Sequence, residues 1–346
     1  MIASAGRRAH IVGWFKESLV HVGLPGEVIS MEFRTTSASL AVADRAVTMP
    51  AYNADEYPAA MRAWFDTERP DLFLSLNDYE HEVLSRGLAD QLREYGCRVA
   101  ALEEGGQETV SDKFSMAKAL RAHGIASPVT HLGTESHDLA RQGPADRMFV
   151  VKHRFGSGST GLRIVEAAHL EAAVADSART ALNRRGLPAY GDLSHVIVQD
   201  RLLGAEFGAD GVFSVDGRAQ LLGVLARRKV QMRSGATDVA TSVDAERFRD
   251  LVGRIGSLIR PSALIDLDII ESADGELHVI DINPRFGGGY PFVHLAGADA
   301  PAVLIQAAAG LEPDLSLLAY EEGVTSARGE TFAVVSRAST PSPLSA

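Results

Sequence analysis

"HVIDINPRFGGGYP" (residues 278–291) has the pattern of a β-strand that ends at a proline and a run of glycines. Asp281, Asn283 and Arg285 alternate with isoleucines, and this alternation places the polar and apolar sets on opposite faces of a strand. A sheet with one face in water is the simplest interpretation. The residues immediately upstream favour a more specific one.

A second alternating stretch, residues 263–272, precedes the first, and Asp274-Gly275 between them predicts a hairpin with a two-residue turn. With that turn, Asp268 faces Asp281 and Asp266 faces Asn283, all on one face. The other predicted pairs are Ser272–Leu277 and Ile270–Val279, and the predicted apolar face carries Leu267, Ile269, Ile280 and Ile282.

Two opposed aspartates repel at a Cβ separation of about 4.5–5.5 Å unless water screens them, one binds a proton, or a cation lies between them. Carboxylate and amide oxygens suit Mg²⁺ (or Mn²⁺), so the hairpin predicts Asp268, Asp281 and Asn283 as metal ligands. Arg285 could hold a phosphate or carboxylate group. The glycines at 287–289 would let the backbone pass close to a ligand.

"FVVKHRFGSGSTGL" (residues 149–162) supplies a complementary element, because Lys152 ends a strand and a glycine-rich loop follows. Backbone N–H groups of such a loop can bind phosphate oxygens, although the spacing matches neither a Walker loop nor the dinucleotide fingerprint. A plain surface loop is the alternative. Downstream, "LARRKVQMRSG" adds four cations, of which at least two are expected at a solvated rim: Arg227, Arg228, Lys229 and Arg233.

Composition limits the function classes. The chain has 346 residues and a net charge of −11, which argues against a general nucleic-acid or membrane-surface binder. Cys97 is the single cysteine, so no internal disulfide can form and a reducing, cytoplasmic location is expected. No apolar run is long enough for a signal peptide or a membrane span. The Ser- and Pro-rich end, residues 336–346, is expected to be a disordered tail.

Short apolar runs alternate with helical patterns up to about residue 110, which predicts an open, mostly parallel sheet. From about residue 206 the pattern is antiparallel, with Asp216-Gly217 in a first hairpin. Among the expected helices are residues 79–96, residues 111–124 with Ser111 as N-cap, and residues 167–186.

The ordered set of features resembles the ATP-grasp superfamily, in particular members related to the large chain of carbamoyl-phosphate synthase. The resemblance rests on "IDINPRFGGGYP" (280–291), on the spacing from Lys113 through Lys152 to Glu206, and on "SAGRR" (4–8). It implies an α/β (α+β) ATP-grasp fold in three parts. These are a Rossmann-like parallel-sheet domain (1–110), a region with a small glycine-rich lid (111–203), and a C-terminal antiparallel-sheet domain with the metal site (204–335).

The resemblance also implies residue roles. Lys113 and Lys152 would contact ATP phosphates, and Lys152 and Arg285 would be catalytic. The implied ATP-binding residues are Lys113, Lys152, Gly156, Ser157, Gly158, Ser159, Gly161, Gln199, Asp200, Leu202 and Glu206, with Glu206 on the ribose. The implied metal ligands are Asp268, Asp281 and Asn283, where the first two are often Glu or Gln in the family. Asp266 is an additional carboxylate, expected beside these ligands or facing solvent.

The implied activity is that of an ADP-forming carboxylate–amine ligase that makes an amide or peptide bond through an acylphosphate. ATP, Mg²⁺, a small carboxylate and an amine, here an amino acid, are the implied partners, and a homodimer is possible; nucleic acid and membrane are not expected. The substrate candidates are Arg233, Arg285, Gly288 and His294, with His153 and Arg154 beside the acid site. A packed histidine is the alternative for His294, and helix capping is expected for Asp78 and Glu80.

Three other functions stay open. ATP-dependent chemistry on bicarbonate or another small acid is the nearest. A nucleotide-binding protein without turnover is a second, although the two lysines, the metal set and Arg285 count against it. A dehydrogenase would use Glu32 on ribose, but "ASAGRRAH" lacks the three-glycine pattern.

Overall fold

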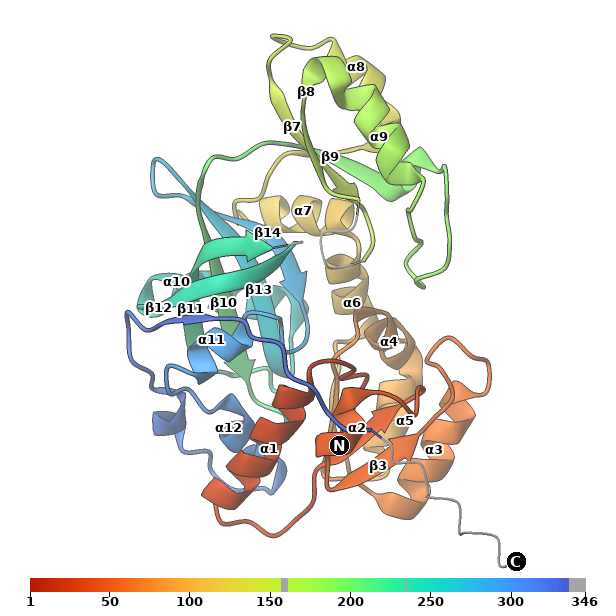
Figure 1. The fold of residues 1–346 in the computed structure, drawn as a ribbon, viewed down its shortest axis with the longest axis vertical. Helices are drawn as coiled ribbons and strands as arrows, with labels where there is room; N and C mark the ends of the chain where they lie inside the picture. The colour runs from red at the N-terminus through yellow and green to blue at the C-terminus, as the bar shows by residue number, and fades with distance from the viewer. Residues whose placement is uncertain (157–160, 234, 336–346) are drawn as a thin grey trace, which may run out of the picture.

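The computed structural model of the chain describes residues 1–156, 161–233 and 235–335. Three sheets form the framework, one parallel and two antiparallel, and the predicted α/β class is confirmed. Figure 1 shows the parallel sheet at the bottom, a small antiparallel sheet with α8 (Ser136–Ala140) and α9 (Leu170–Ala178) at the top, and the largest sheet between them. The loop residues Ser157, Gly158 and Ser159 and the tail 336–346 lie outside the described residues.

The N-terminal sheet has the strand order β3-β2-β1-β4-β5, and every pair is parallel. Its strands are β1 (Ile2–Ala3), β2 (Ile29–Glu32), β3 (Arg45–Thr48), β4 (Leu72–Ser75) and β5 (Arg98–Ala100). Its helices are α1 (Ala9–His21), α2 (Ala38–Val42), α3 (Tyr57–Glu68), α4 (Asp78–Val83) and α5 (Ala89–Arg93). A core around Met61, Phe65 and Phe73 fixes α3 against the sheet, because these side chains are fully buried.

The helix expected over residues 79–96 is interrupted. A π-helical turn, η1 (Leu84–Leu88), separates α4 from α5, and the backbone leaves the helical region at Arg86 and Gly87, where φ of Gly87 is 96°. Glycine tolerates this positive φ, which the uniform helical pattern of the sequence did not reveal.

Two helices lead out of the N-terminal domain: α6 (Glu104–Ser111) and α7 (Lys113–Ala122). The predicted N-cap Ser111 is wrong, because Ser111 ends α6. Asp112 caps α7 instead and accepts hydrogen bonds from the backbone N–H groups of Phe114 and Ser115.

The small antiparallel sheet, with its helices, is called the lid here. Its strand order is β6-β9-β7-β8, formed by β6 (Thr130–Leu132), β7 (Met148–His153), β8 (Arg163–Glu166) and β9 (Val196–Asp200). Three short 3₁₀ turns accompany them: η2 (Gly133–Glu135), η3 (Ala167–His169) and η4 (Leu193–His195). The helix expected over 167–186 is shorter, since residues 167–169 form η3 and α9 ends at Ala178. Leu170 and Val174 on the buried face of α9 pack in the lid core.

The largest sheet is antiparallel throughout, in the order β14-β13-β10-β11-β12-β15. Its strands are β10 (Gly204–Phe213), β11 (Leu221–Arg233), β12 (Ala236–Val243), β13 (Ala263–Ser272), β14 (Leu277–Asn283) and β15 (Thr325–Ala327). The predicted hairpin of β10 and β11 is confirmed. The remaining elements are α10 (Glu246–Ile259), α11 (Tyr290–His294), α12 (Ala300–Ala308) and the 3₁₀ turn η5 (Leu315–Leu318).

The β13–β14 hairpin has the predicted pairs Asp268–Asp281 and Asp266–Asn283, but it reaches them differently. The chain reverses over residues 273–275, one residue more than predicted, and Ser272 N–H donates to the carbonyl of Glu276 at 3.0 Å. Near the turn Ile270 therefore faces His278 and Glu271 faces Leu277, so the predicted pairs Ser272–Leu277 and Ile270–Val279 are wrong. A β-bulge at Ile280 restores the predicted register, and Val279 takes the buried place expected for Ile280.

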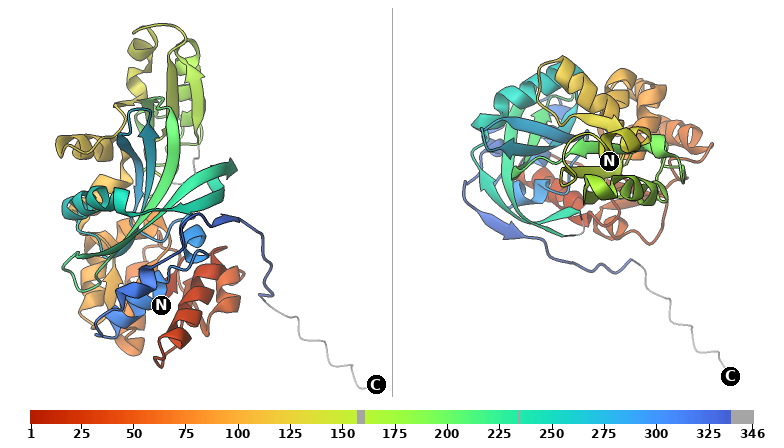
Figure 2. Two further views of the ribbon diagram at one scale, coloured as in Figure 1. Left: turned by 90° about the vertical axis from the view of Figure 1, so that its left-hand side faces the viewer. Right: turned by 90° about the horizontal axis from the view of Figure 1, so that it is seen from above.

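The apolar face of the large sheet packs on α10 through a core that includes Leu267, Ile269 and Val279 from the hairpin. The opposite face is polar around Gly208, whereas Val212, Leu225 and Leu264 on that face are apolar and buried. Figures 1 and 2 show the large sheet between the lid and the N-terminal domain. A second core joins α1 and α12 to β10 and β11, which holds the N-terminal domain against the large sheet. Within the described part of the chain, no helix combines the length and the apolar character that a membrane crossing needs.

Candidate functional site

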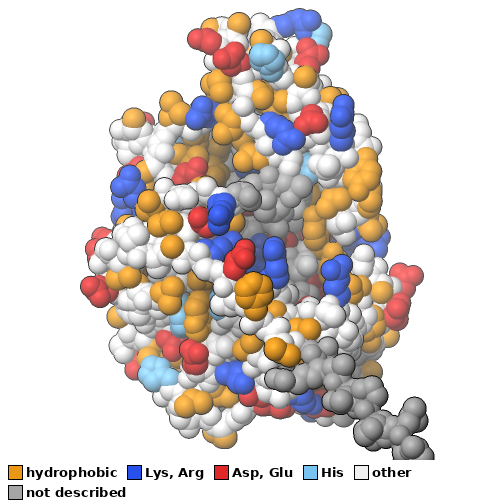
Figure 3. Space-filling view, viewed as in Figure 1, with side chains coloured by type: hydrophobic (Ala, Val, Ile, Leu, Met, Phe, Trp, Pro, Cys, Tyr) orange, Lys and Arg blue, Asp and Glu red, His pale blue; other side chains and the backbone are white. Residues whose placement is uncertain are grey.

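Strand alternation and sheet register gather polar side chains on one face of the large sheet. Gly208 pairs with Arg227 and with Asp268, so residues in step with it on each strand share its face. We call this set the polar face: Glu206, Asp210, Arg227, Lys229, Asp266, Asp268, Asp281 and Asn283. Figure 3 shows Lys and Arg side chains, together with Asp and Glu side chains, near the middle of the molecule.

Each of the two opposed aspartates is neutralised by a lysine. Lys229 Nζ lies 2.6 Å from Asp268 Oδ1, and Lys113 Nζ lies 2.8 Å from Asp281 Oδ1. Lys113 also donates to the backbone carbonyl of Gly156 at 3.0 Å, which ties α7 to the start of the glycine-rich loop. Like-charge repulsion between the carboxylates is thus relieved by two ammonium groups.

Lys152, on β7 of the lid, reaches the same place and donates to the carbonyl of Ile280 at 3.2 Å. Burial lowers the pKa of Lys152 to about 8, Asp281 raises it, and Lys113 lowers it further. Three lysines from three different elements therefore converge on the metal-ligand candidates. Such a cluster suits a polyanionic ligand, because the negative charge of the ligand would neutralise the lysines in place of the aspartates.

The oxygen set fits Mg²⁺. Asp268, Asp281 and Asn283 supply two carboxylates and an amide on adjacent strands. Mg²⁺ bound to a nucleotide takes one or two protein carboxylates and completes its octahedron with phosphate oxygens and water. A site closed by protein alone is not present in the described residues, since no group of three or more Asp, Glu, His or Cys side chains there could hold a metal. The donor set therefore matches a metal that arrives with phosphates.

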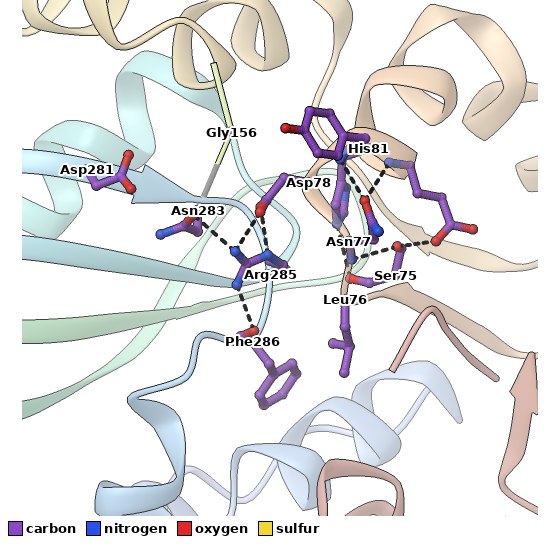
Figure 4. A network of polar contacts seen from close by, with 12 residues as sticks. Ser75, Leu76, Asn77, Asp78, His81, Gly156, Asp281, Asn283, Arg285 and Phe286 are labelled. Atoms are coloured by element: carbon purple, nitrogen blue, oxygen red, sulfur yellow. Dashed lines mark hydrogen bonds and ion pairs between the residues drawn. The ribbon is translucent and has the colours of Figure 1, made fainter. Parts of the chain in front are cut away.

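Arg285 is held in a fork by Asp78, which the sequence suggested only as a helix cap. Its Nε and Nη2 lie 2.6 and 2.7 Å from the two oxygens of Asp78, and Nη2 also donates to Asn283 Oδ1 at 3.2 Å (Figure 4). Asn77 caps α4 instead. The other expected cap, Glu80, is buried and accepts hydrogen bonds from Tyr57 and Ser75.

Arg8 of the "SAGRR" segment lies behind this pair. It donates to the carbonyls of Leu76 and Phe286, the latter at 3.4 Å. Burial and the nearby Arg285 lower the pKa of Arg8 to about 10. Arg8 therefore bridges the strand end before α4 to the chain just after Arg285.

A buried cluster lies beneath the glycine run. Arg227 forms ion pairs with Asp210 and Asp266, and all three are at most 6% exposed. Asp266 therefore does not face solvent. A Cβ atom at Gly287 would collide with the Asp266 carboxylate, and one at Gly289 with the Arg227 guanidinium. Two of the three glycines are thus required for close approach to this cluster, whereas the exposed Gly288 is not.

The adenine and ribose candidates lie where β9 leads into β10. Gln199 is buried and donates to Thr130 Oγ1 at 2.7 Å, while Asp200 is paired with Arg147 at 2.6 Å. Leu202 is half-buried in the connection. Glu206 belongs to the polar face, 4.0 Å from Lys229, and its side chain is 42% exposed, so its carboxylate is accessible to a ligand.

The remaining sequence candidates divide. Gly156 and Gly161 flank the loop with positive φ, as a tight glycine turn requires. Arg233 and Arg228 are exposed, as expected for a rim. His153 is buried against Ser177, and Arg154 is paired with Asp112, so neither is available to a substrate acid. His294 contacts Trp14 with ring centroids 4.0 Å apart and Tyr290 Oη at 3.1 Å, which favours packing.

Glu32, the candidate ribose acid of a dehydrogenase, is buried and accepts hydrogen bonds from Gly6 N at 2.6 Å and Ser39 Oγ at 2.7 Å. It is therefore committed to the protein. The sequence reasoning named Lys229 among four cations without saying which of them reach the site, and it missed the pairing role of Asp78. Alternation with Arg227 along β11 was the available signal for Lys229; Asp78 gave none, because it lies 207 residues from Arg285.

The geometry agrees with the sequence families that match the chain. Residues 110–289 match the ATP-grasp domain family, and residues 1–100 match the PylC-like N-terminal domain. The chain therefore belongs to the ATP-grasp family. A closer relation to the large chain of carbamoyl-phosphate synthase stays a prediction. Among proteins with curated descriptions, none matches the sequence significantly.

Solved structures share the fold at low identity. The Hydrogenobacter thermophilus 2-oxoglutarate carboxylase biotin carboxylase domain dimer, in complex with MgADP, ADP and bicarbonate, superposes with a TM-score of 0.67 at 15% identity over 90% of this chain and 69% of that one. An L-amino acid ligase from Bacillus licheniformis gives 0.64 at 17% over 89% and 73%. N5-carboxyaminoimidazole synthetase from Staphylococcus aureus with ADP gives 0.67 at 14% over 90% and 77%.

Proposed function

We propose that the protein is an ATP-dependent ligase that joins a carboxylate to an amine and releases ADP and phosphate. One observation carries the proposal. Lys113, Lys152 and Lys229 converge on the oxygen set of Asp268, Asp281 and Asn283 at the polar face. This arrangement has the charge pattern that a nucleotide polyphosphate with a divalent metal requires.

Partner exchange would let the nucleotide bind without leaving an uncompensated charge. In the ligand-free protein, Lys113 pairs with Asp281 and Lys229 with Asp268. On binding, the lysines would turn to phosphate oxygens and the carboxylates, with Asn283, would hold Mg²⁺. When bound there, Mg²⁺ would neutralise phosphate charge and orient the transferred group. Lys152 and Gly156 connect this site to the lid.

The chemistry requires only positioning and charge. An oxygen of the substrate carboxylate attacks the γ-phosphorus of ATP, the bond to the β-phosphate oxygen breaks, and ADP leaves. The amine nitrogen then attacks the carbonyl carbon of the acylphosphate, the carbon–oxygen bond to phosphate breaks, and phosphate leaves. The ammonium form of the amine loses two protons in all, of which phosphate takes one, and one proton is released overall. Lys152 and Arg285 would stabilise the transferred group, which fits a site without a nucleophilic side chain.

The other predicted roles belong to the same proposal. Gln199 and the backbone near Leu202 would meet the adenine edge, with Asp200 beside them, and Glu206 would hold the ribose hydroxyls. The glycine-rich loop that begins at Gly156 would cover the phosphates and exclude water. The L-amino acid ligase among the fold relatives supports an amine acceptor, and the relatives bound to MgADP and ADP support the nucleotide and metal.

Bicarbonate as the acid is a second candidate, because it occupies one of the fold relatives. It would be phosphorylated by the same positioning groups. A homodimer and a cytoplasmic location stay predictions. Product analysis with bicarbonate and with organic acids separates the two candidates.

Purified protein should be incubated with ATP, Mg²⁺ and pairs of amino acids while ADP and phosphate are followed. Release of both products with one pair, together with a new amide detected by mass spectrometry, is the expected result. Formation of AMP and pyrophosphate would contradict the acylphosphate route. Release of ADP and phosphate with bicarbonate and no organic acid would favour the second candidate.

A further inference from the structure

A cavity of about 360 Å³ lies in the N-terminal domain beside the polar face. Its walls come from α3, α4, η1 and the lid residue Arg185. It shares Tyr79 and Glu82 with a much smaller cavity that contains Lys113 and Asn283. The large cavity therefore adjoins the place where the acylphosphate would form, and nothing in the proposed nucleotide site occupies it.

Glu82 is the charged group at the junction of the two cavities, and it is 4% exposed. Among the described residues its carboxylate has two polar neighbours, Gln107 Nε2 at 3.5 Å and Arg86 Nη2 at 3.7 Å. An ionised carboxylate can accept about four hydrogen bonds, and burying it without them is costly. Glu82 therefore retains capacity for a cationic donor that enters from the cavity.

Three arginines give the cavity positive charge. Arg62, Arg86 and Arg185 line it, and the acid that lines it besides Glu82 is the exposed Asp55. Arg62 is oriented by a hydrogen bond to Gln91 Oε1 at 2.9 Å, while the side chain of Arg86 is 49% exposed and lies 3.7 Å from Glu82. Guanidinium forks bind carboxylates in two-point contacts, so these arginines suit a ligand carboxylate.

Aromatic rings form the middle of the cavity. Tyr52 and Tyr79 are stacked, with centroids 6.3 Å apart and planes 15° apart. The lid closes over Tyr79, because Gly186 lies so near its ring that a Cβ atom there would be 3.1 Å away, and a Cβ atom at Gly156 would be 2.8 Å from its hydroxyl. The side chain of a ligand would pack against these rings.

The irregular turn η1 positions Arg86 in the cavity. Regular helical geometry is lost at Arg86 and Gly87, and π-turns of this kind are frequent at functional sites. Arg86 lies four residues after Glu82, about one helical turn, and both side chains line the same cavity.

We infer that this cavity binds the amine substrate of the proposed ligase as a free amino acid, with its ammonium group at Glu82 and its carboxylate at Arg62, Arg86 and Arg185. The inference rests on the proposed function and adds the site at which the amino acid binds. The volume is at the small end of ligand cavities, which fits a single amino acid and not a peptide or polynucleotide. The ammonium end lies toward the acylphosphate, where the amine must react.

The test measures binding of each of the twenty amino acids, and of the N-acetyl and amide forms of any that bind, to the full chain with Mg²⁺ and a non-hydrolysable ATP analogue. Calorimetry with wild type, Glu82→Gln and Arg86→Met gives the affinities. At least one amino acid should bind to wild type, and Glu82→Gln should weaken it about 10- to 100-fold. Its N-acetyl form should bind weakly to both proteins, because it lacks the ammonium group.

Arg86→Met changes a half-exposed side chain, so it tests the site even if Glu82→Gln does not fold. It should weaken the amino acid more than its amide. The matched control is Glu94→Gln on the exposed surface of the same domain, which should bind like wild type. Affinity for the ATP analogue should be the same in all four proteins. Binding by no amino acid, or equal binding by wild type and both variants, would overturn the inference.

Turnover separates the two proposals. If amino acids bind as expected but no acid leads to release of ADP and phosphate, the ligase proposal fails and the cavity assignment stands. If ADP and phosphate are released with an amine that lacks a carboxylate, at the same rate in wild type and Arg86→Met, the cavity assignment fails and the ligase proposal stands.

Discussion

The polar face contains two kinds of ion pair that differ in burial. The cluster of Arg227 with Asp210 and Asp266 is closed, and the side chain of Arg227 is 1% exposed. Two other pairs lie two residues further along the strands from Asp266 and Asn283, Lys229–Asp268 and Lys113–Asp281. The side chains of their aspartates are 29% and 17% exposed. The same chemistry is therefore sealed in one region and open to exchange in the other.

Burial decides what each region can do. Two carboxylates share one guanidinium in the sealed cluster, and burial raises the pKa of Asp210 despite the neighbouring Arg227. No ligand can replace a partner there, so the cluster holds β10, β11 and β13 in register beneath the glycine run. In the open pairs, the proposed phosphate and metal ligands would replace both partners.

The sealed cluster should give the largest change when it is broken. Arg227→Met leaves two buried carboxylates without a counter-charge, which should lower the free energy of unfolding by about 3–5 kcal/mol. Urea unfolding followed by circular dichroism measures this. Arg218→Met, which removes an exposed arginine paired with Asp216 at the turn of the same hairpin, should leave stability close to that of wild type. Equal losses in both variants would mean that burial does not distinguish the pairs.

The open pairs should show the reverse pattern, with a large effect on turnover and a small one on stability. Asp281→Asn removes the charge of a proposed metal ligand but keeps an oxygen acceptor for Lys113. ADP release should fall about 100- to 1000-fold, and the free energy of unfolding should change by about 1 kcal/mol. Asp250→Asn, on the exposed side of α10, is the control. Full turnover in Asp281→Asn would remove Asp281 from the metal site.

The two regions also differ in how much of their structure can be predicted from the sequence. Alternation and an Asp-Gly turn place Asp268 opposite Asp281, and that pairing is correct although the turn is longer and a bulge at Ile280 compensates. Local patterns also predicted the parallel and antiparallel sheets. Such features depend on neighbours within a few residues, which the chain states directly.

Features that join distant segments could not be predicted. Asp78 meets Arg285 across 207 residues, and the sealed cluster needs strands β10, β11 and β13 together. The cavity at Glu82 depends on the irregular turn η1 and on a lid residue. A single sequence carries no local signal for these contacts, because packing between elements creates them.

A buried neutral group in the N-terminal domain extends the comparison to pH. His81 Nε2 lies 3.1 Å from the carbonyl of Ser75, its Nδ1 has no partner among the described residues, and burial lowers its pKa to about 4. Between pH 6.5 and 4 the unfolded chain binds a proton there and the folded chain does not. Stability should therefore fall by about 3 kcal/mol as the pH falls through this window.

Urea unfolding of wild type and His81→Gln at pH 7 and pH 4 isolates this contribution, since other titrating groups are common to both proteins. The variant should lose less stability than wild type on acidification. Parallel losses in the two proteins would show that His81 does not contribute.

Titration of Lys152 should give the smallest effect. As the pH rises, it should raise the stability of the fold but lower its affinity for a nucleotide. Burial lowers its pKa to about 8, so above that pH the ligand-free fold loses a proton that the unfolded chain keeps up to its ordinary pKa. The cost of the buried charge is then relieved, and stability gains as the pH rises from 8 toward 10. The proposed contact of Lys152 with phosphate needs the charged ammonium, so affinity for a non-hydrolysable ATP analogue should fall about tenfold between pH 7 and pH 9. Lys152→Arg stays charged throughout, and calorimetry on it should show a much smaller fall; an equal fall in both proteins would place the titrating group elsewhere.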